Sequence, residues 1–422
     1  MRQLEAFGSV CVDAKASRFA LSPHPPFGHL QPTKREAFRG YPEGEGRVTT
    51  LSITRLTLTD FRNHADLRME PTGDLVCLYG PNGAGKTNIL EAISLLVPGR
   101  GLRAQDFHLL ARLEGMGAWA VAAEALTPQG EVRLGTSFEG SAATTRKVAV
   151  DGQLLKSSGM LAQHLKMLWL TPAQDRLFMG PASDRRRFFD RMVASFNAEH
   201  AGHVSAFEKL MRERNALLQQ PRVDNVWAAT LETQMAEQAI AIAVARNEAA
   251  NLLAKHFASG ANHGAFPWGV LQLHGEIEEL VAAFPAVQAE DKYAKILVDS
   301  RGQDRAQQRT TRGPHRADIS VLHGPKSTPS ELCSTGEQKA LLIGLVLAQA
   351  QAAKDVLGAA PILLLDEVAA HLDEARRRGL FASLAGLGCQ AWMTGTDENL
   401  FAEAGATACK YEVKDGIVHV RN

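Results

Sequence analysis

The sequence has little of what marks secreted, metal-binding or membrane proteins. It contains five cysteines, spread over 422 residues without a CxxC pair, and no group of histidines at metal-binding spacing. Its longest apolar run, residues 340–348, is about half of the roughly 18 residues that cross a bilayer, and Lys339 precedes it directly. We therefore expect reduced thiols in a cytoplasmic protein that has no membrane span.

The sequence also lacks an excess of either charge and any sustained heptad repeat. Lys plus Arg and Asp plus Glu each number 46, so the formal net charge is zero. Contact with nucleic acid must then come from local patches, and a histone-like coating of DNA is excluded. Without heptads, a long coiled-coil arm is not expected. Apolar residues make up 45% and charged residues 22%, as in ordinary globular domains.

The first 47 residues lack the periodic apolar pattern of a folded segment. Prolines and glycines interrupt them, and no helical or strand period lasts for ten residues. We interpret residues 1–47 as a disordered N-terminal extension that is dispensable for folding. A second interpretation stays open, in which translation starts at the position written as Val48 and this segment is never made.

The rest of the chain divides by its patterns into three parts. Residues 48–182 combine an apolar strand at 75–79, a helix after it and an antiparallel meander at 117–152. Residues 183–300 have a helical period almost throughout, with Pro221 dividing them. Residues 301–422 alternate strands and helices and end in a hairpin about Asp415 and Gly416. We predict an α/β head with a mixed sheet and a β meander, formed by 48–182 and 301–422, and an inserted, mostly helical lobe at 183–300.

An eight-residue segment between a predicted strand and a predicted helix fits the phosphate-binding pattern G-x-x-x-x-G-K-[ST]. Its residues are Gly80, Pro81, Asn82, Gly83, Ala84, Gly85, Lys86 and Thr87. Backbone amides of such a loop turn towards a phosphate, the lysine reaches the β and γ oxygens, and the threonine hydroxyl ligates Mg²⁺. The alternative is a glycine turn that matches the pattern by chance, which has a probability of roughly one or two in a hundred for a chain of this length. We predict that the segment binds ATP and Mg²⁺.

The strand predicted at 362–365 ends in two adjacent carboxylates, Asp366 and Glu367. Alone, the pair is equally compatible with the solvated end of any strand. Together with the phosphate-binding loop, it assigns Asp366 to Mg²⁺ and Glu367 to the attacking water, as base or orienting group. These two residues make ATP hydrolysis the expected reaction.

A polar segment, Ser334-Thr335-Gly336-Glu337, precedes a strongly apolar helix. It can be understood simply as a helix cap, with Ser334 or Thr335 as the N-cap. Its position some 30 residues before Asp366 is also where ABC-type ATPases carry their signature sequence. In those proteins the signature of one subunit closes over the nucleotide of another, and Ala370 to Asp373 then takes the place of the dimer-facing loop.

The motifs and the ~280 residues that separate the phosphate-binding loop from the carboxylates resemble the SMC-like branch of ABC ATPases. Within that branch, residues 48–422 are similar to the RecF family of bacterial recombination mediators. The segments that carry this resemblance are Asp60-Phe61-Arg62-Asn63, Gly180-Pro181, Arg185-Arg186-Arg187-Phe188, Gly313-Pro314-His315-Arg316, Ser334-Thr335-Gly336-Glu337-Gln338-Lys339 and Thr394-Gly395-Thr396-Asp397. The resemblance implies an ABC-type ATPase head.

The same resemblance implies a function and further site residues. Members form ATP-dependent homodimers that clamp DNA at single-strand gaps, hydrolyse ATP weakly with stimulation by DNA, and act with RecR and RecO to load RecA. Arg62 should approach the nucleotide phosphates, Gln174 should occupy the Q-loop, and Ser334 and Gly336 should contact ATP held by the other subunit. No histidine follows the strand that ends at Thr394, so the group that senses the γ-phosphate is not assigned. An ATPase subunit of another ABC or SMC-like system is the alternative.

Two arginine clusters are candidates for DNA contact. Arg301, Arg305, Arg309, Arg312 and Arg316 lie within sixteen residues that contain one acid, Asp304. A second cluster is formed by residues 185–187. Arginines of this kind neutralise phosphates, but they equally form a solvated face or a salt-bridged seam between lobes, and these interpretations stay open for each cluster. His315 is open in the same way between a structural and a functional role.

Overall fold

The computed structural model describes residues 51–140, 143–258, 265–405 and 408–421, so the predicted N-terminal extension lies outside the described residues. One six-stranded sheet has the order β15-β14-β3-β13-β12-β8. Its strands are β3 (Leu75–Tyr79), β8 (Met167–Leu170), β12 (Ile362–Leu365), β13 (Ala391–Gly395), β14 (Cys409–Lys414) and β15 (Ile417–Arg421). All pairings are parallel except the terminal hairpin of β14 and β15, which turns at the predicted position. Strands β3, β12 and β13 are wholly buried, as continuous apolar strands of a covered parallel sheet should be.

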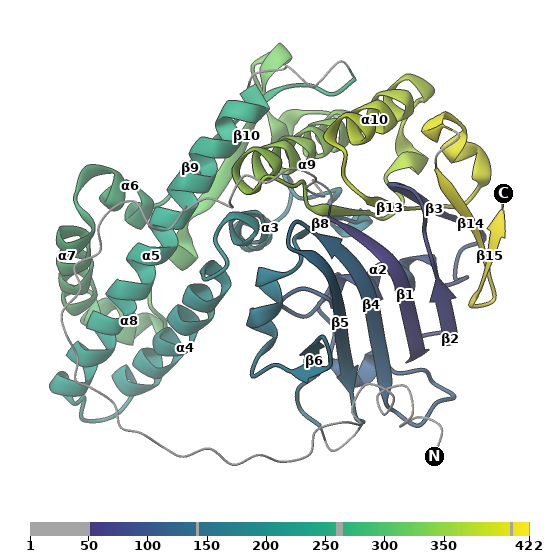
Figure 1. The fold of residues 1–422 in the computed structure, drawn as a ribbon. Coiled ribbons are helices and arrows are strands. Elements are labelled where there is room, and N and C mark those ends of the chain that lie inside the picture. The colour runs from purple at the N-terminus through teal and green to yellow at the C-terminus, as the bar shows by residue number, and fades with distance from the viewer. Residues whose placement is uncertain (1–50, 141–142, 259–264, 406–407, 422) are drawn as a thin grey trace. The chain divides into compact units, whose positions relative to one another are not determined.

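A second sheet is antiparallel and has the order β2-β1-β4-β5-β6-β7 (Figure 1). Its strands are β1 (Ser52–Phe61), β2 (His64–Met69), β4 (Trp119–Thr127), β5 (Gly130–Phe138), β6 (Lys147–Val150) and β7 (Gln153–Leu154). The predicted meander is confirmed, and β1 has a register shift between Ile53 and Arg55. Alternate residues of β1, β4 and β5 face a core that also contains α2 (Lys86–Ser94) and one face of the parallel sheet.

The opposite face of the parallel sheet is covered by α3 (Ala182–Phe196), α9 (Thr335–Leu357) and α10 (Glu374–Leu387). Helix α9 is the one element among the described residues that is long and apolar enough to cross a membrane. Most of its side chains are buried, and Leu341 and Leu345 pack into the same core as Leu363 and Leu365 of β12. The helix is therefore apolar all round because it lies inside the protein.

Residues between the two halves of the head are mostly helical, with a small sheet. The helices are α4 (His200–Leu218), α5 (Asn225–Ala258), α6 (Glu276–Ala283), α7 (Ala286–Asp299) and α8 (Arg301–Gln307). Pro221 lies between α4 and α5, as predicted. Strands β9 (Gly269–His274), β10 (Asp318–His323) and β11 (Thr328–Pro329) pair antiparallel in the order β11-β10-β9.

The mixed α/β architecture matches the predicted fold class, and residues after Val48 form one compact unit. Two elements depart from the sequence analysis. Strand β9 lies within 183–300, where a six-residue strand is easily missed among long segments with a helical period. Helix α8 continues the helical part past residue 300. The domain boundaries at 182/183 and 300/301 stay predictions.

Candidate nucleotide-binding site

The predicted site residues come together at the carboxyl edge of the parallel sheet, where open α/β sheets bind ligands. The phosphate-binding loop follows β3, and Asp366 and Glu367 follow β12. Strand β13 lies between these two strands and ends beside them at Gly395. Gln174 follows β8, which pairs with β12 on its other side. The 279-residue gap between Thr87 and Asp366 is closed by a hydrogen bond of 2.8 Å between their side chains.

Two glycines of the loop have backbone conformations and surroundings that other residues would not tolerate. Gly80 has φ 146°, and a Cβ there would lie 2.1 Å from the carbonyl oxygen of Val413 on β14. Gly85 has φ 110°, and a Cβ there would lie 2.5 Å from Nδ2 of Asn63. Both glycines therefore let the loop pass close to neighbouring backbone and side chains.

The loop is braced by residues from the β1–β2 turn and the C-terminal hairpin. Asn63 donates from Nδ2 to the carbonyl of Ala84 at 3.0 Å, and the amide of Gly416 donates to the same carbonyl at 3.1 Å. The buried ring of His64 lies with Nδ1 2.7 Å from the Gly416 carbonyl oxygen and Nε2 3.2 Å from that of Gly85. Neither His64 nor the contact of the predicted hairpin with the loop was expected from the sequence, although Asn63 belongs to a motif singled out there.

Lys86 and the free amides of the loop form a cradle for an anion. Lys86 is buried, and its Nζ donates to the carbonyls of Gly80 at 2.7 Å and Pro81 at 2.8 Å. Burial lowers the pKa of Lys86, and the nearby charges of Glu367 and Asp366 oppose that shift. In the part of the chain that the structure describes, the amides of Gly83, Gly85, Lys86 and Thr87 have no protein acceptor. Unpaired amides before a helix fit phosphate.

A second group of atoms has the chemistry of a Mg²⁺ site. Oδ1 of the buried Asp366 accepts hydrogen bonds from the hydroxyls of Thr87 and Thr394, each at 2.8 Å. Hydroxyl and carboxylate oxygens are ligands that Mg²⁺ prefers, and it binds with few of them when phosphates supply the rest. The residues present therefore fit the ion that the sequence analysis predicted, with Thr87 and Asp366 as its protein ligands. Thr394, on β13, was not predicted and orients the carboxylate.

Glu367 has a strained backbone at the end of β12. Its φ is 54°, which is uncommon for a residue other than glycine. Its amide donates to the Thr394 hydroxyl at 2.8 Å, so the same threonine holds both carboxylate residues. The partly exposed carboxylate acts on Lys86 through charge. This arrangement leaves its oxygens available to accept a proton from water or to orient it.

Two residues expected at the nucleotide make other contacts. Arg62, with φ 56°, donates to both carboxylate oxygens of Glu91 on α2 at 2.9 and 3.0 Å and to Gln105 at 2.5 Å. Gln174 accepts from the amide and the hydroxyl of Thr171, both at 2.8 Å, and so caps the short helix Pro172–Gln174. Their roles towards nucleotide stay predictions.

The predicted signature segment is an exposed helix cap. Ser334 is the N-cap of α9, and Glu337 accepts from its amide at 3.0 Å and its hydroxyl at 2.9 Å. A hydrogen bond from Lys326, together with those from Ser334, lowers the pKa of Glu337 to about 2. Ser334 and Gly336 are both exposed, and a Cβ at Gly336 would meet nothing within 4 Å. The cap is therefore compatible with a surface that receives a ligand.

The second arginine cluster forms contacts within the chain. Arg185 makes a two-pronged ion pair with Asp318 of β10 at 2.8 and 2.6 Å, and Arg186 donates to the Ala317 carbonyl at 2.6 Å. Arg187, which is exposed, pairs with Asp184 at 2.5 Å. These contacts favour the seam interpretation for Arg185 and Arg186 and leave Arg187 at the surface.

Comparison with known proteins decides the family. Residues 52–419 match the family model of the RecF/RecN/SMC N terminal domain. The chain is 48% identical over 369 residues to the DNA replication and repair protein RecF of Rhizobium etli (strain CIAT 652), covering 87% of this chain and 98% of that one. The chain belongs to the RecF family. The RecF protein of Agrobacterium fabrum (strain C58 / ATCC 33970) is 47% identical with the same coverage.

Solved structures show that the RecF fold extends over the same region. The structure of the recombination mediator protein RecF-ATPrS in the RecFOR pathway matches with a TM-score of 0.77 and 22% identity, covering 88% of this chain and 98% of that one. The corresponding RecF-ATP structure matches with a TM-score of 0.76, 22% identity and coverages of 88% and 99%. The fold predicted from the motifs is therefore confirmed.

Proposed function

We propose that this RecF-family chain is a weak ATPase that dimerises on ATP and clamps DNA in recombinational repair and replication restart. The observation that carries the proposal is the meeting of Lys86, Thr87 and Asp366 at one sheet edge, while the signature residues Ser334 and Gly336 face solvent. Because the nucleotide ligands and the signature lie on different surfaces of one chain, the signature of one subunit can complete the nucleotide site of another.

The chemistry follows from the residues at the sheet edge. The free amides and Lys86 bind the β- and γ-phosphates, and Thr87 and Asp366 hold Mg²⁺, which neutralises phosphate charge when bound. Glu367 orients the attacking water and accepts its proton. Thr394 fixes both acidic residues, so it positions the metal ligand and the base together.

Dimerisation supplies the switch. In the closed dimer, ATP contacts the loop of one subunit together with Ser334 and Gly336 of the other. Because the separated subunits lack the second set of contacts, ATP favours the closed dimer, and hydrolysis removes that preference. DNA stimulation of hydrolysis belongs to the same proposal, since DNA that stabilises the closed dimer prolongs the state in which Glu367 acts.

The partners are proposed from the family. The relatives are named DNA replication and repair proteins and a recombination mediator of the RecFOR pathway. We assign this chain the same setting in the cytoplasm: DNA with single-strand gaps, RecR and RecO as protein partners, and RecA as the protein that is loaded.

Sedimentation of the purified chain with and without ATP and gapped DNA tests the proposal. Dimers should form with ATP and be lost in Ser334→Arg, which places a bulky charge on the exposed signature. Thr230→Arg adds the same group to the exposed surface of α5 and should dimerise normally. ATP-independent dimers, or equal behaviour of the two variants, would contradict a shared site.

A further inference from the structure

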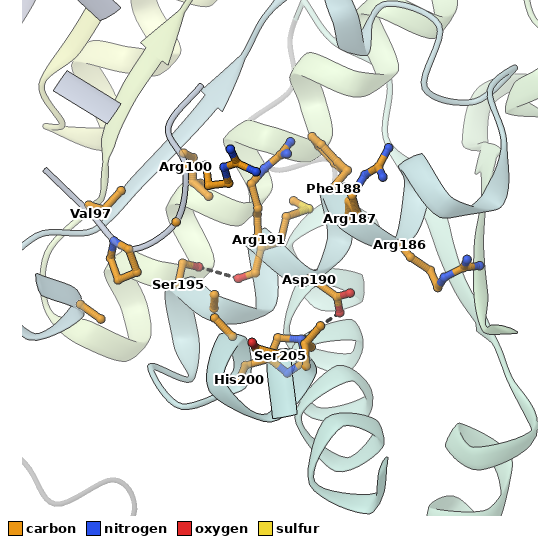
Figure 2. A pocket seen from close by; sticks show the side chains of 18 of the residues that line it. Val97, Arg100, Arg186, Arg187, Phe188, Asp190, Arg191, Ser195, His200 and Ser205 are labelled. Atoms are coloured by element: carbon orange, nitrogen blue, oxygen red, sulfur yellow. Dashed lines mark hydrogen bonds and ion pairs between the residues drawn. The ribbon is translucent and has the colours of Figure 1, made fainter. Parts of the chain in front are cut away.

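A cavity of about 590 Å³ lies away from the nucleotide edge, with walls from β8 and from helices α3, α4 and α5 (Figure 2). Its volume is that of a small-molecule site. Apolar side chains line much of it, including Leu102, Met167, Met192 and Ile242. None of the predicted nucleotide or metal ligands is among the lining residues. The established fold and the proposed ATPase cycle therefore leave this space without a role.

The wall of the cavity holds donors that have no acceptor. The guanidinium of Arg191 lies 5.1 Å from the ring centre of Trp169 and 5.6 Å from that of Phe188. Among the residues that the structure describes, one terminal nitrogen of Arg191 is buried and has no hydrogen-bond partner. The indole nitrogen of Trp169 is buried without a partner in the same part of the chain. Both groups can only donate, so each can pair only with an acceptor, such as an oxygen of an anion.

Charges elsewhere in the lining do not neutralise Arg191. Asp190 is committed to Arg246, at 2.8 and 3.0 Å, and to His200, at 2.8 Å. Glu208 is the other acidic lining residue, and it is exposed on α4. Arg187 adds a like charge near Arg191, and Arg100 also lines this space. In Figure 2 the side chains of Arg100 and Arg191 lie in the same part of the view, and Arg187 lies beyond Phe188.

We propose that this cavity binds an organic anion, in which an acidic group contacts Arg191 and an apolar body fills the space lined by Met167, Met192 and Ile242. A desolvated guanidinium without an acid is costly, and a carboxylate or phosphate restores the missing partner with matching planar geometry. Burial lowers the pKa of Arg191 to about 10, which is in keeping with an uncompensated charge.

The arrangement disfavours a nucleic acid strand as the occupant. Strand binding uses a row of phosphate contacts along an open groove and free aromatic faces on which bases stack. Here the rings of Trp169 and Phe188 carry the Arg191 guanidinium over their faces. With these aromatic faces already occupied and much of the lining apolar, the cavity fits a compact anion better than a strand.

Two fluorescent probes separate the charge from the apolar contact. The anionic 1-anilinonaphthalene-8-sulfonate and the neutral N-phenyl-1-naphthylamine are similar in size, and each is titrated into wild type and Arg191→Met. We expect the anionic probe to lose about tenfold in affinity in the variant, while the neutral probe stays within about twofold. The control is Arg212→Met, which removes an exposed arginine of α4 that does not line the cavity and should change neither affinity. Unchanged ATP hydrolysis verifies that each variant is folded.

Thermal unfolding gives an independent readout. Arg191→Met should melt at the same temperature as wild type or higher, because methionine keeps apolar contact with the two rings and removes a half-buried guanidinium that has no ion pair among the described residues. A lower melting temperature with equal affinity for both probes would make Arg191 a structural residue and overturn the proposal. Loss of the anionic probe in Lys86→Ala would move binding to the nucleotide site, and Arg191-dependent displacement by a single-stranded oligonucleotide would identify a nucleic acid site. Either result overturns the proposal.

Discussion

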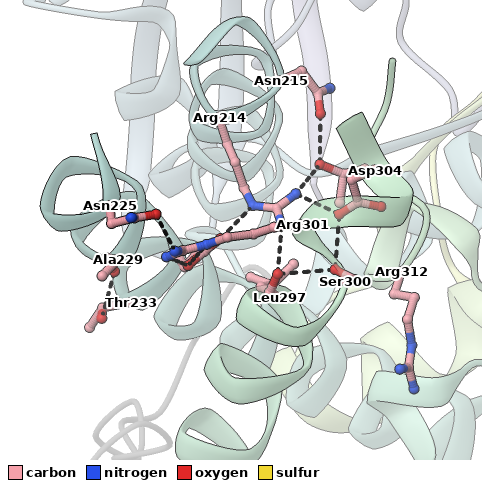
Figure 3. A network of polar contacts seen from close by, with 12 residues as sticks. Arg214, Asn215, Asn225, Ala229, Thr233, Leu297, Ser300, Arg301, Asp304 and Arg312 are labelled. Atoms are coloured by element: carbon pink, nitrogen blue, oxygen red, sulfur yellow. Dashed lines mark hydrogen bonds and ion pairs between the residues drawn. The ribbon is translucent and has the colours of Figure 1, made fainter. Parts of the chain in front are cut away.

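At the nucleotide edge, polar groups are held in position but left open to a ligand, whereas inside the helical lobe the charges around Arg214 satisfy one another. Arg214 is fully buried and donates to Glu232 at 3.0 Å, Asp304 at 2.7 Å and the Leu297 carbonyl at 2.7 Å (Figure 3). The loop amides beside Lys86 have no such partners. Charge in a sequence therefore indicates a binding site only when the fold leaves it unpaired.

The first arginine cluster shows the same contrast within one short run. Arg301 forms an ion pair with the buried Glu232, with its terminal nitrogen 2.5 Å from the carboxylate, and Arg312 pairs with Glu276. Arg309 and Arg316 are exposed, and neither side chain forms a hydrogen bond or an ion pair among the described residues. The seam interpretation holds for Arg301, while Arg309 and Arg316 keep the DNA interpretation open.

The largest effect should come from breaking the closed network. Arg214→Met leaves the carboxylates of Glu232 and Asp304 buried with too few partners, so we expect a loss of about 3–5 kcal/mol in the free energy of unfolding. Chemical denaturation measures this loss. Lys209→Met, at an exposed position of the same helix, should change stability by less than about 0.5 kcal/mol. Similar results for the two variants would show that the network contributes little.

The open site should respond in activity and not in stability. Glu367→Gln keeps the shape of the side chain but cannot accept a proton, so hydrolysis should fall about 100-fold, or roughly 3 kcal/mol in the barrier. ATP binding and melting temperature should be retained, and the ATP-bound dimer should accumulate. Asp366→Ala should lose ATP binding as well. Glu374→Gln, on the exposed start of α10, is the control, and equal turnover in both glutamine variants would remove Glu367 from the mechanism.

A pH effect should come from His315, which packs against Phe207 of α4. Its Nε2 lies 3.0 Å from the Thr310 carbonyl oxygen and its ring stacks on Phe207. Its buried Nδ1 has no partner within the described part of the chain. Burial lowers the pKa of His315 to about 4. In the unfolded chain the imidazole has a pKa near 6.5. Between about pH 6.5 and pH 4 the unfolded state therefore binds a proton that the folded state does not bind, so the free energy of unfolding falls as the pH drops through this range.

Between pH 7 and pH 5 this histidine should cost about 2 kcal/mol of stability. The measurement is the free energy of unfolding at each pH for wild type and His315→Gln, whose amide can still donate to the Thr310 carbonyl. The difference between the two proteins isolates His315 from the other histidines. A parallel decline in both would assign the pH dependence elsewhere.

Local patterns predicted most of the fold and the centre of the site. The apolar runs that became β3 and β12 and the glycine-rich loop each carry their signal in consecutive residues, so periodicity and spacing suffice. The assignment of both Thr87 and Asp366 to one Mg²⁺ site also implied that they would meet, and in the structure both follow parallel strands of one sheet.

What the sequence did not predict depends on contacts between distant segments. His64 reaches Gly416 across 352 residues, and Thr394 joins Asp366 from a neighbouring strand. A single histidine or threonine carries no sequence pattern that predicts a contact with so distant a residue. The ion pair of Arg301 with Glu232 could not be predicted either, because these residues are 69 positions apart and the sequence does not show which acidic residues lie near an arginine in the folded chain.

The smallest effect should separate the two kinds of arginine within the first cluster. Replacing both Arg309 and Arg316 with Ala removes two exposed cations and should weaken DNA binding similarly for all sequences, because phosphate contacts carry no base information. Each lost contact lowers the slope of log affinity against log salt by about one. Arg301→Ala should leave that slope unchanged and instead lower stability, because it removes a partner of the buried Glu232.

Fluorescence anisotropy with gapped DNA over a salt series, alongside thermal melts, measures both properties. If the double variant keeps the wild-type slope while Arg301→Ala flattens it, the assignment of exposed and paired arginines is wrong, and DNA contact lies on the side of the lobe that Arg301 occupies.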